Sequence, residues 1–331
     1  MKKLLAAFSA AILVLTLASC GTQKQSVSVE AMDTFMKIEY YGDESVGEKL
    51  TGEIKRLDSL FSVTDKNSEV YALNRDKEVK PSDDLSALLK RSLTLCDRLD
   101  GALDVTILPV VEKWGFLSGK YRVPEKQEIQ SALKVVNYKN IEVDNDKVKL
   151  KNNAKLDLGA VAKGYAADKC LEILGDNNVE TSLLNLGGTI AVHGRKPDGT
   201  PWRVGIADPD NPSDYIGFVS CSDKVVATSG GYERYFEKDG RRYIHIIDTQ
   251  TGFPSDNGIA SVTVISDSGT LSDALSTALF VKGLDGAREY HRDNPDFDYV
   301  ILTTDKKLYI SEGIVNDFTL SESDRYEVVK N

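Results

Sequence analysis

Hydrophobic and polar positions follow two regular patterns along this chain. Apolar and polar residues alternate over residues 34–41, which predicts a strand. Apolar residues recur every three or four positions over 46–61, which predicts a helix. Ser82 precedes two aspartates and a second helical stripe, so another helix is expected from there to about Leu99, and a third over 271–281. The chain therefore contains both kinds of regular element.

The other predicted elements are short strands separated by turn residues. They cover residues 141–143, 148–150, 181–186, 202–207, 215–222, 225–228, 243–247, 261–266, 298–303 and 307–310. Helices and hairpins occur without a regular strand–helix alternation. The pattern predicts an α+β fold in which mixed, mostly antiparallel sheets pack against helices.

The N-terminus has the form of an export signal. Lys2 and Lys3 precede an apolar stretch over residues 4–18, which is too short and poorly flanked for a transmembrane helix. Small residues then lead to Cys20, a pattern similar to the lipidation site of bacterial lipoproteins. The sequence predicts a signal peptide over 1–19 and a lipid anchor on Cys20. An ordinary signal peptide followed by an incidental cysteine is the alternative.

The polar stretch that follows is expected to be a flexible tether over residues 20–30, before a domain over 31–331. Removing the signal peptide, which contains two lysines, changes the net charge from −10 to −12. An acidic surface without a basic stripe argues against nucleic acid as a partner. The other cysteines are odd in number and match no metal-site spacing, so free thiols, most of them buried, are expected at Cys96, Cys170 and Cys221.

The segment from Asp157 to Asp168, D-L-G-A-V-A-K-G-Y-A-A-D, combines acids, two glycines and a lysine at a predicted strand-to-helix junction. Backbone N–H groups at such a junction point toward whatever binds there, and Lys163 adds a cation beside Asp157. A phosphate group with a metal ion would use both charges, and the glycines are expected to shape the turn. The alternative is a structural turn in which Lys163 pairs with Asp157.

Three further positions carry candidate chemistry. Asp273 and Thr277 stand four residues apart on the predicted helix over 271–281, so both oxygens project from one face. Hard oxygen donors of this kind suit Mg²⁺, although an acidic residue near a helix N-terminus also stabilises the helix dipole without a ligand. His245 ends a predicted strand, where it is either a base or a structural residue, and Asp248 could orient it.

Seven motifs occur along the chain in a fixed order. They are F-S with S-E-V (61–70), D-G-A-L-D-V-T (100–106), D-L-G-A-V-A-K-G-Y-A-A-D (157–168), N-L-G-G (185–188), T-S-G-G-Y (228–232), H-I-I-D-T-Q-T-G (245–252) and D-A-L-S-T (273–277). In this order they resemble the ApbE-type flavin transferases, the FAD:protein FMN transferases, which are exported bacterial lipoproteins. The resemblance extends from about Ala31 to about Phe280.

The resemblance implies an enzyme that cleaves the pyrophosphate of FAD, moves FMN onto a threonine hydroxyl of a target protein and releases AMP. It assigns Mg²⁺ to Asp273, Thr277 and the backbone carbonyl of Ala160, and the role of base to His245. It assigns the FAD site to Met32, Thr64, Ala102, Leu103, Asp104, Asp157, Lys163 and Ile247. Positioning and charge neutralisation carry most of phosphoryl-transfer catalysis, in agreement with such a site.

Three positions depart from the family pattern. Asp33 stands where the family has glycine, Thr249 where it has proline, and Thr64 where a tyrosine that can stack on the flavin is often found. Some relatives without that tyrosine mainly hydrolyse FAD to FMN and AMP, so an FAD pyrophosphatase is the alternative activity. Loss of one stacking aromatic leaves the metal chemistry intact, and transfer is therefore preferred.

The resemblance also implies partners and a location. The family's acceptors carry an S/T-G-A-T-like motif that this chain lacks, so other proteins are the expected acceptors. Candidates are extracytoplasmic subunits of Rnf-type or sodium-pumping NADH:quinone reductase complexes, or other exported flavoproteins. The expected location is the outer face of a bacterial membrane, on the periplasmic or cell-surface side. A non-enzymatic flavin carrier or solute-binding lipoprotein is the competing class, and such proteins usually have two similar α/β lobes.

Overall fold

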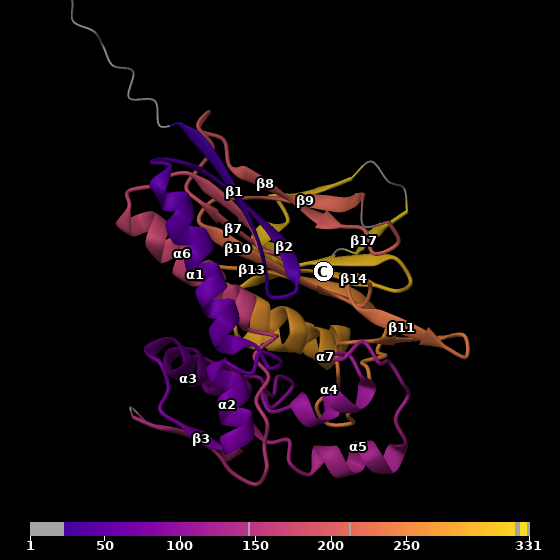
Figure 1. Ribbon diagram of the computed structural model, residues 1–331. Coiled ribbons are helices and arrows are strands. Elements are labelled where there is room, and N and C mark those ends of the chain that lie inside the picture. Colours follow the sequence, from indigo (N-terminus) through magenta and orange to yellow (C-terminus); the bar gives the residue numbers. More distant parts are fainter. Residues whose placement is uncertain (1–22, 145, 212, 322–324, 330–331) are drawn as a thin grey trace, which may run out of the picture.

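The computed structural model describes residues 23–144, 146–211, 213–321 and 325–329 (Figure 1). The predicted signal peptide and the predicted lipidation site, Cys20, lie outside these residues. Within the described part of the chain, no helix combines the length and the apolar character needed to cross a membrane.

Nine of the described strands form a central sheet (Figure 1). In spatial order they are β1 (Lys24–Ala31), β2 (Thr34–Tyr41), β6 (Ser182–Asn185), β7 (Thr189–His193), β10 (Lys224–Gly230), β13 (Ile259–Ser266), β14 (Asp298–Thr303), β15 (Lys307–Ile310) and β17 (Glu327–Val329). Neighbouring strands are antiparallel except β15 and β17. Along β2, Met36, Ile38 and Tyr40 are fully buried, which explains the alternation in the sequence.

The two faces of the central sheet are covered differently. Helices α1 (Ser45–Phe61), α6 (Ala162–Asp176) and α7 (Gly269–Asp293) lie on one face, and apolar side chains between helices and sheet form the main core. The other face packs against a small antiparallel sheet of β8 (Trp202–Ala207), β9 (Tyr215–Cys221) and β16 (Phe318–Leu320), with a second apolar cluster between them. The short helix η2 (Glu312–Ile314) precedes β16.

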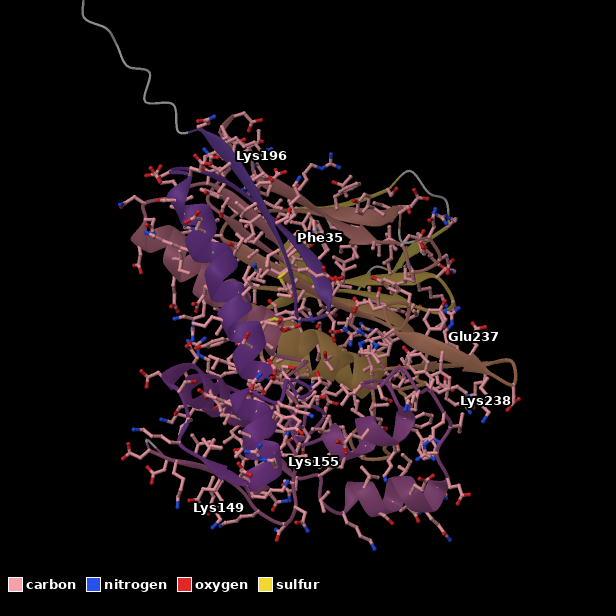
Figure 2. The ribbon with its side chains drawn as sticks, in the orientation of Figure 1. Phe35, Lys149, Lys155, Lys196, Glu237 and Lys238 are labelled. Atoms are coloured by element: carbon pink, nitrogen blue, oxygen red, sulfur yellow. The ribbon has the colours of Figure 1, made fainter. Side chains whose placement is uncertain are left out.

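A smaller helical region lies beyond the ends of α1 and α7 (Figure 1). It contains α2 (Glu69–Asp76), α3 (Asp83–Arg98), α4 (Leu108–Trp114), α5 (Lys126–Leu133), η1 (Tyr138–Asn140) and the small sheet of β3 (Glu78–Val79), β4 (Ile141–Val143) and β5 (Val148–Leu150). A separate hairpin of β11 (Tyr235–Lys238) and β12 (Arg241–Ile244) projects from the body, and Figure 2 shows Glu237 and Lys238 near its far end. The base of this hairpin leads directly into the segment that carries His245.

The α+β fold expected from the sequence is confirmed, and most element boundaries agree with it. The Ser82 hydroxyl accepts the N–H of Leu85 at 3.2 Å, so α3 begins where the capping pattern predicts. Cys96 and Cys170 are buried free thiols, and Cys221 is a partly buried free thiol.

The expected tether over residues 20–30 is wrong from Lys24 onward. Residues 24–31 form β1, which pairs with β2 along its whole length. Met32 and Asp33 make the two-residue turn between them, with φ angles of 50° and 58°, as a type I′ hairpin requires. The sequence of β1 contains few apolar residues, so its strand character depends on pairing with β2 and not on its own pattern.

Two other boundaries differ from the prediction. Strand β12 ends at Ile244, although a strand was expected through residue 247. Helix α7 extends well past the predicted end at residue 281, but Gly283 interrupts it with a φ of 75°. The Asn257 side chain donates to the Phe280 carbonyl at 2.7 Å, which satisfies a carbonyl left free by the interruption.

Candidate functional site

The segment over 157–168 is a loop followed by the first turns of α6. The Asp157 N–H donates to the Val105 carbonyl at 2.8 Å, which holds this loop against the loop over 100–106. Oδ1 of Asp157 accepts the N–H of Gly159 at 2.8 Å and closes the turn. The tight turn is therefore confirmed, whereas the strand expected before it is replaced by an isolated bridge at Lys155.

Asp273 changes how α6 begins. Its Oδ2 accepts the N–H of Gly164 at 2.9 Å. In a regular helix this N–H would instead donate to the carbonyl of Ala160, four residues earlier. Within the described residues nothing donates to the Ala160 carbonyl. A buried carboxylate thus leaves a backbone carbonyl oxygen available near itself.

Two glycines allow α6 and α7 to approach closely enough for this contact. A Cβ on Gly164 would lie 2.1 Å from the Gly269 carbonyl oxygen, and a Cβ on Gly269 would lie 2.2 Å from the Gly164 carbonyl oxygen. Both neighbours are backbone atoms, which cannot move without displacing a helix. Gly164 therefore serves helix packing and does not shape the turn, contrary to the expectation from the sequence.

We expect Gly164→Ala to lower the free energy of unfolding by about 1–3 kcal/mol, because the added methyl group forces α6 away from α7. Chemical denaturation of the full chain measures this change. Gly175→Ala on the same helix is the matched control, since a Cβ there meets nothing within 4 Å. The control should be neutral or slightly stabilising. Equal effects of the two substitutions would contradict the packing role of Gly164.

Asp168, the last residue of the segment, caps helix α7. Its carboxylate accepts the N–H groups of Gly269 at 2.5 Å and Thr270 at 3.0 Å, and the Thr270 hydroxyl at 2.6 Å. The two N–H groups are ones that the first turn of a helix leaves without intrahelical partners. Asp168 therefore has a structural role in capping α7, and any ligand at this segment would contact the residues before it.

Thr277 follows Asp273 by one turn of α7, as the sequence predicted. Its Oγ1 lies 3.1 Å from the Ser229 hydroxyl of β10, which in turn lies 2.8 Å from the hydroxyl of Ser276. This hydrogen bonding fixes the Thr277 side chain against the central sheet. Asp273 and Thr277 therefore present a carboxylate and an ordered hydroxyl on neighbouring turns.

The Ala160 carbonyl, the Asp273 carboxylate and the Thr277 hydroxyl fit a hard cation. Oδ1 of Asp273 accepts no hydrogen bond from the described residues, because only Oδ2 is used by Gly164. The described part of the chain has no group of three or more His, Cys, Asp or Glu side chains suited to a metal. A cation here would rely on one carboxylate, neutral oxygens, water and substrate, which is the coordination that Mg²⁺ prefers and Zn²⁺ does not.

Lys163 lies among charged groups that the sequence did not connect with it. It forms no ion pair with Asp157 within the described residues, so the purely structural alternative for this lysine is not supported. Partial loss of hydrating water raises the pKa of Glu233 to about 7; Lys163 opposes this shift and Asp273 adds to it. Glu233 also lies close to the Gly187–Gly188 turn, since its Oε1 is 3.5 Å from where a Gly188 Cβ would be.

Asp157 and Arg234 interact with each other and belong with these charged groups. Burial raises the pKa of the Asp157 carboxyl, while the Gly159 N–H and the charge of Arg234 lower it. The Arg234 guanidinium also forms an exposed ion pair with Asp33 at 3.4 Å. These groups from different parts of the chain form a charged cluster of two cations, Lys163 and Arg234, and four carboxylates, Asp33, Asp157, Glu233 and Asp273.

His245 is held by a backbone carbonyl. Its Nδ1 lies 3.1 Å from the Arg234 carbonyl oxygen, which also accepts the His245 N–H at 3.0 Å. A carbonyl can only accept, so Nδ1 carries the proton and Nε2 has the free lone pair of the neutral ring. Burial lowers the pKa of His245 to about 4; the Arg234 carbonyl opposes this shift, and the charges of Arg234 and Lys163 add to it. The ring is therefore a neutral proton acceptor at pH 7.

Asp248 does not orient His245. Its carboxylate accepts the N–H groups of Gln250 at 2.8 Å and Thr251 at 3.3 Å, and so closes the next turn. The hydroxyl of Thr249 donates to the Gly101 carbonyl at 2.6 Å, which joins this turn to the loop over 100–106.

The loop over 100–106 is tightly anchored. Oδ1 of Asp104 accepts the N–H and hydroxyl of Thr106 at 2.8 and 2.6 Å, and Oδ2 accepts the Tyr138 N–H at 3.0 Å. Burial raises the pKa of this carboxyl, and the same hydrogen bonds oppose the shift. Ala102 and Leu103 are buried in the main core. Their contact with FAD stays a prediction, and Asp104 already has a clear structural role.

The three remaining predicted residues occupy different surroundings. Met32 lies in the β1–β2 turn and its N–H donates to Asp58 at 3.0 Å. Thr64 is exposed, with its hydroxyl 3.2 Å from that of Ser62. Ile247 is buried in an aromatic cluster around Trp114. Met32 is next to Asp33 in the sequence and Ile247 is two residues from His245, whereas no contact among the described residues places Thr64 within the charged cluster.

Comparison with known proteins agrees with this architecture. A model of the ApbE family matches residues 32–301. The chain belongs to the ApbE family. It is 32% identical to the FAD:protein FMN transferase of Haemophilus influenzae over 329 residues, covering 92% of this chain and 94% of the relative. It is 32% identical to that of Treponema pallidum over 283 residues, covering 80% and 78%.

Solved ApbE structures share the fold. The crystal structure of the ApbE protein from Thermotoga maritima has a TM-score of 0.80 and 34% identity, covering 91% of this chain and 97% of that one. The apo form of the Pseudomonas stutzeri flavinyl transferase ApbE has a TM-score of 0.77 and 28% identity, covering 92% and 95%. The ApbE match begins inside the β1–β2 turn, so β1 precedes it.

Two charged residues of the cluster, Glu233 and Arg234, were missed from the sequence. They follow T-S-G-G-Y directly, and exposed charged residues after a glycine turn are common in any chain. Only the pairing of β11 with β12 shows that Arg234 lies opposite His245. No local signal could have identified them.

Proposed function

We propose that this chain is a Mg²⁺-dependent FAD:protein FMN transferase, which breaks the pyrophosphate bond of FAD, attaches FMN through a phosphoester to a threonine hydroxyl and releases AMP. Membership of the ApbE family and the names of relatives that align over most of their length support the class. The observation that carries the site is the capture of the Gly164 N–H by Asp273, which leaves the Ala160 carbonyl available near a carboxylate.

The charged and polar groups would have different roles in the reaction. Ala160, Asp273 and Thr277 would hold Mg²⁺, which when bound would neutralise charge on the pyrophosphate oxygens. Lys163 would offset the further negative charge that develops on departing AMP. Without nearby positive charge, the negative charge on departing AMP would not be stabilised. The cations of the charged cluster are therefore expected to increase the rate.

His245 would supply the base. Its Nε2 lone pair would accept the proton of the acceptor threonine hydroxyl as the oxygen attacks the phosphorus of the FMN half. The oxygen–phosphorus bond to AMP then breaks, and AMP leaves with the bonding electrons. Because the pKa of His245 lies near 4, the ring is unprotonated and competent throughout the neutral range.

An FAD pyrophosphatase is the second candidate, in which water replaces the threonine hydroxyl. The exposed Thr64, without aromatic surface to hold the flavin, favours it. A two-lobed carrier finds no support in the architecture, which has one central sheet.

We place the enzyme on the outer face of a bacterial membrane, anchored by lipid on Cys20, on the strength of its N-terminal sequence. The acceptors would be exported redox proteins with an S/T-G-A-T-like motif, such as subunits of Rnf-type or sodium-pumping NADH:quinone reductase complexes. An acidic protein surface is compatible with a protein acceptor and unfavourable for nucleic acid.

Incubation of the full chain with FAD, Mg²⁺ and an acceptor domain tests the activity. We expect AMP in solution and an equal amount of FMN on one threonine of the acceptor, measured by chromatography and mass spectrometry. AMP without covalent flavin on a competent acceptor would identify the pyrophosphatase. Release of neither product would overturn both enzymatic assignments.

A further inference from the structure

The ion pair between Asp33 and Arg234 joins two segments that lie 201 residues apart in the sequence. Asp33 lies in the β1–β2 turn, and Arg234 immediately precedes β11. Asp33 Oδ2 and an Arg234 guanidinium nitrogen are 3.4 Å apart, and their side chains are 83% and 47% exposed. An exposed pair at this distance is weak, so another anion can displace the aspartate.

The backbone does not require an acid at position 33. Asp33 has a φ of 58°, a conformation that glycine and asparagine adopt with less strain. Arg234 is the one hydrogen-bond and ion-pair partner of the Asp33 carboxylate within the described residues, and the Asp33 charge also adds to the raised pKa of Asp58. The attractive partner of the Asp33 charge is therefore Arg234, and the turn conformation does not need that charge.

Arg234 is one of two cations at the centre of the cluster. The charge of Arg234 contributes to lowering the pKa of Asp157, Glu233 and His245, and the charge of Lys163 contributes in the same direction at Glu233 and His245, so the two cations act on the same groups. A pyrophosphate brings two negative charges, and a guanidinium binds phosphate oxygens with two parallel hydrogen bonds. Arg234 has the charge, the position and the exposure to bind the second phosphate beside Lys163.

We infer that Arg234 binds a phosphate of FAD and that Asp33 competes with that phosphate for the guanidinium, so that Asp33 sets the affinity for FAD. This inference rests on the proposed function, because it takes FAD as the substrate. The main chain of Arg234 has a separate task, holding Nδ1 of His245, which substitution of its side chain leaves in place. The two contributions of this residue can therefore be separated.

Asp33→Asn and Arg234→Gln test the competition. We expect Asp33→Asn to lower the Kd for FAD about two- to fivefold, because it removes the competing charge and keeps a side chain that tolerates the turn. We expect Arg234→Gln to raise this Kd about ten- to a hundredfold. Flavin fluorescence titration of the full chain, with EDTA present to prevent turnover, gives the Kd, and transfer assays give KM and kcat.

The double variant decides whether Asp33 acts through Arg234. In the Arg234→Gln background, Asp33→Asn should leave the Kd unchanged. Glu30→Gln is the matched control, since it removes an exposed acid two residues before Met32 that has no described ion pair. It should leave the Kd unchanged in both backgrounds.

Three results would overturn the inference. They are equal tightening by Asp33→Asn with and without Arg234, equal tightening by Glu30→Gln, and no change in Kd with Asp33→Asn in the native background. A wild-type chain that binds FAD but neither transfers FMN nor releases AMP would instead overturn the proposed function. The Kd measurements would still test the competition in that case.

Discussion

Asp273→Asn should lower kcat for FMN transfer about a thousandfold while the protein stays folded. Asparagine keeps an oxygen that accepts the Gly164 N–H but loses the negative charge that would hold Mg²⁺. Loss of metal-based charge stabilisation is worth several kcal/mol, or about three powers of ten in rate. Transfer rates at increasing Mg²⁺ and the thermal midpoint of the same variant measure the two effects separately.

Asp273→Ala should differ from the asparagine variant in stability. It leaves the Gly164 N–H without its acceptor, which costs about 1–3 kcal/mol in unfolding free energy. Asp168→Asn is the matched control at the same helix junction, since it weakens the cap of α7 by about 1 kcal/mol without touching the cation ligands. Normal transfer by Asp273→Asn would show that the cation is held elsewhere.

His245→Gln should lower kcat about a hundred- to ten-thousandfold, because it removes the base that accepts the threonine proton. In the native protein, kcat/KM should rise with pH through about 4 and be flat near neutrality, since burial lowers the pKa of His245 to about 4 and only the neutral ring is active. The variant should lose this acid limb. Transfer rates between pH 3.5 and 8 measure the profile.

The lowered pKa of His245 also predicts that the folded protein becomes less stable as the pH falls. Unfolded His245, with an ordinary pKa near 6.5, binds a proton that the folded ring does not bind until about pH 4. Its contribution to stability is therefore complete above about pH 6.5 and is lost as the pH falls toward 4.

His193→Gln is the matched control for the activity of His245→Gln, because His193 pairs with Asp223 on the surface. An acid limb near pH 7 would indicate Glu233, whose pKa is about 7, and would remove His245 from the role of base.

Short-range patterns predicted most of the fold. The helical stripe of α1, the capping serine of α3 and the alternation of β2 are properties of residues within a few positions of each other. The i, i+4 relation of Asp273 and Thr277 belongs to this class, because the helical period alone places both on one face. Strand β1 was missed because its side of the β1–β2 pairing has few apolar residues.

The features of the candidate site that could not be predicted from the sequence depend on contacts between residues far apart along the chain. Nothing near Gly164 in the sequence shows that its N–H bonds to a residue 109 positions away, or that its missing side chain admits a neighbouring helix. Asp248 is close to His245 in sequence, yet the carbonyl that orients the ring comes from Arg234, across a hairpin. Proximity along the chain was a poor guide where strand pairing decides the neighbour.

The contacts between α6 and α7 have a consequence for how the chain can change over evolution. Gly164 bonds to Asp273 and Asp168 bonds to Gly269, so the two contacts are four residues apart on each helix and run in opposite directions. Inserting or deleting one residue between them would rotate one helix by about 100° relative to the other and break both contacts at once. The interval from residue 164 to 168 should therefore tolerate substitutions but not changes of length, and any cation site at this junction would keep its geometry while the surrounding loops diverge.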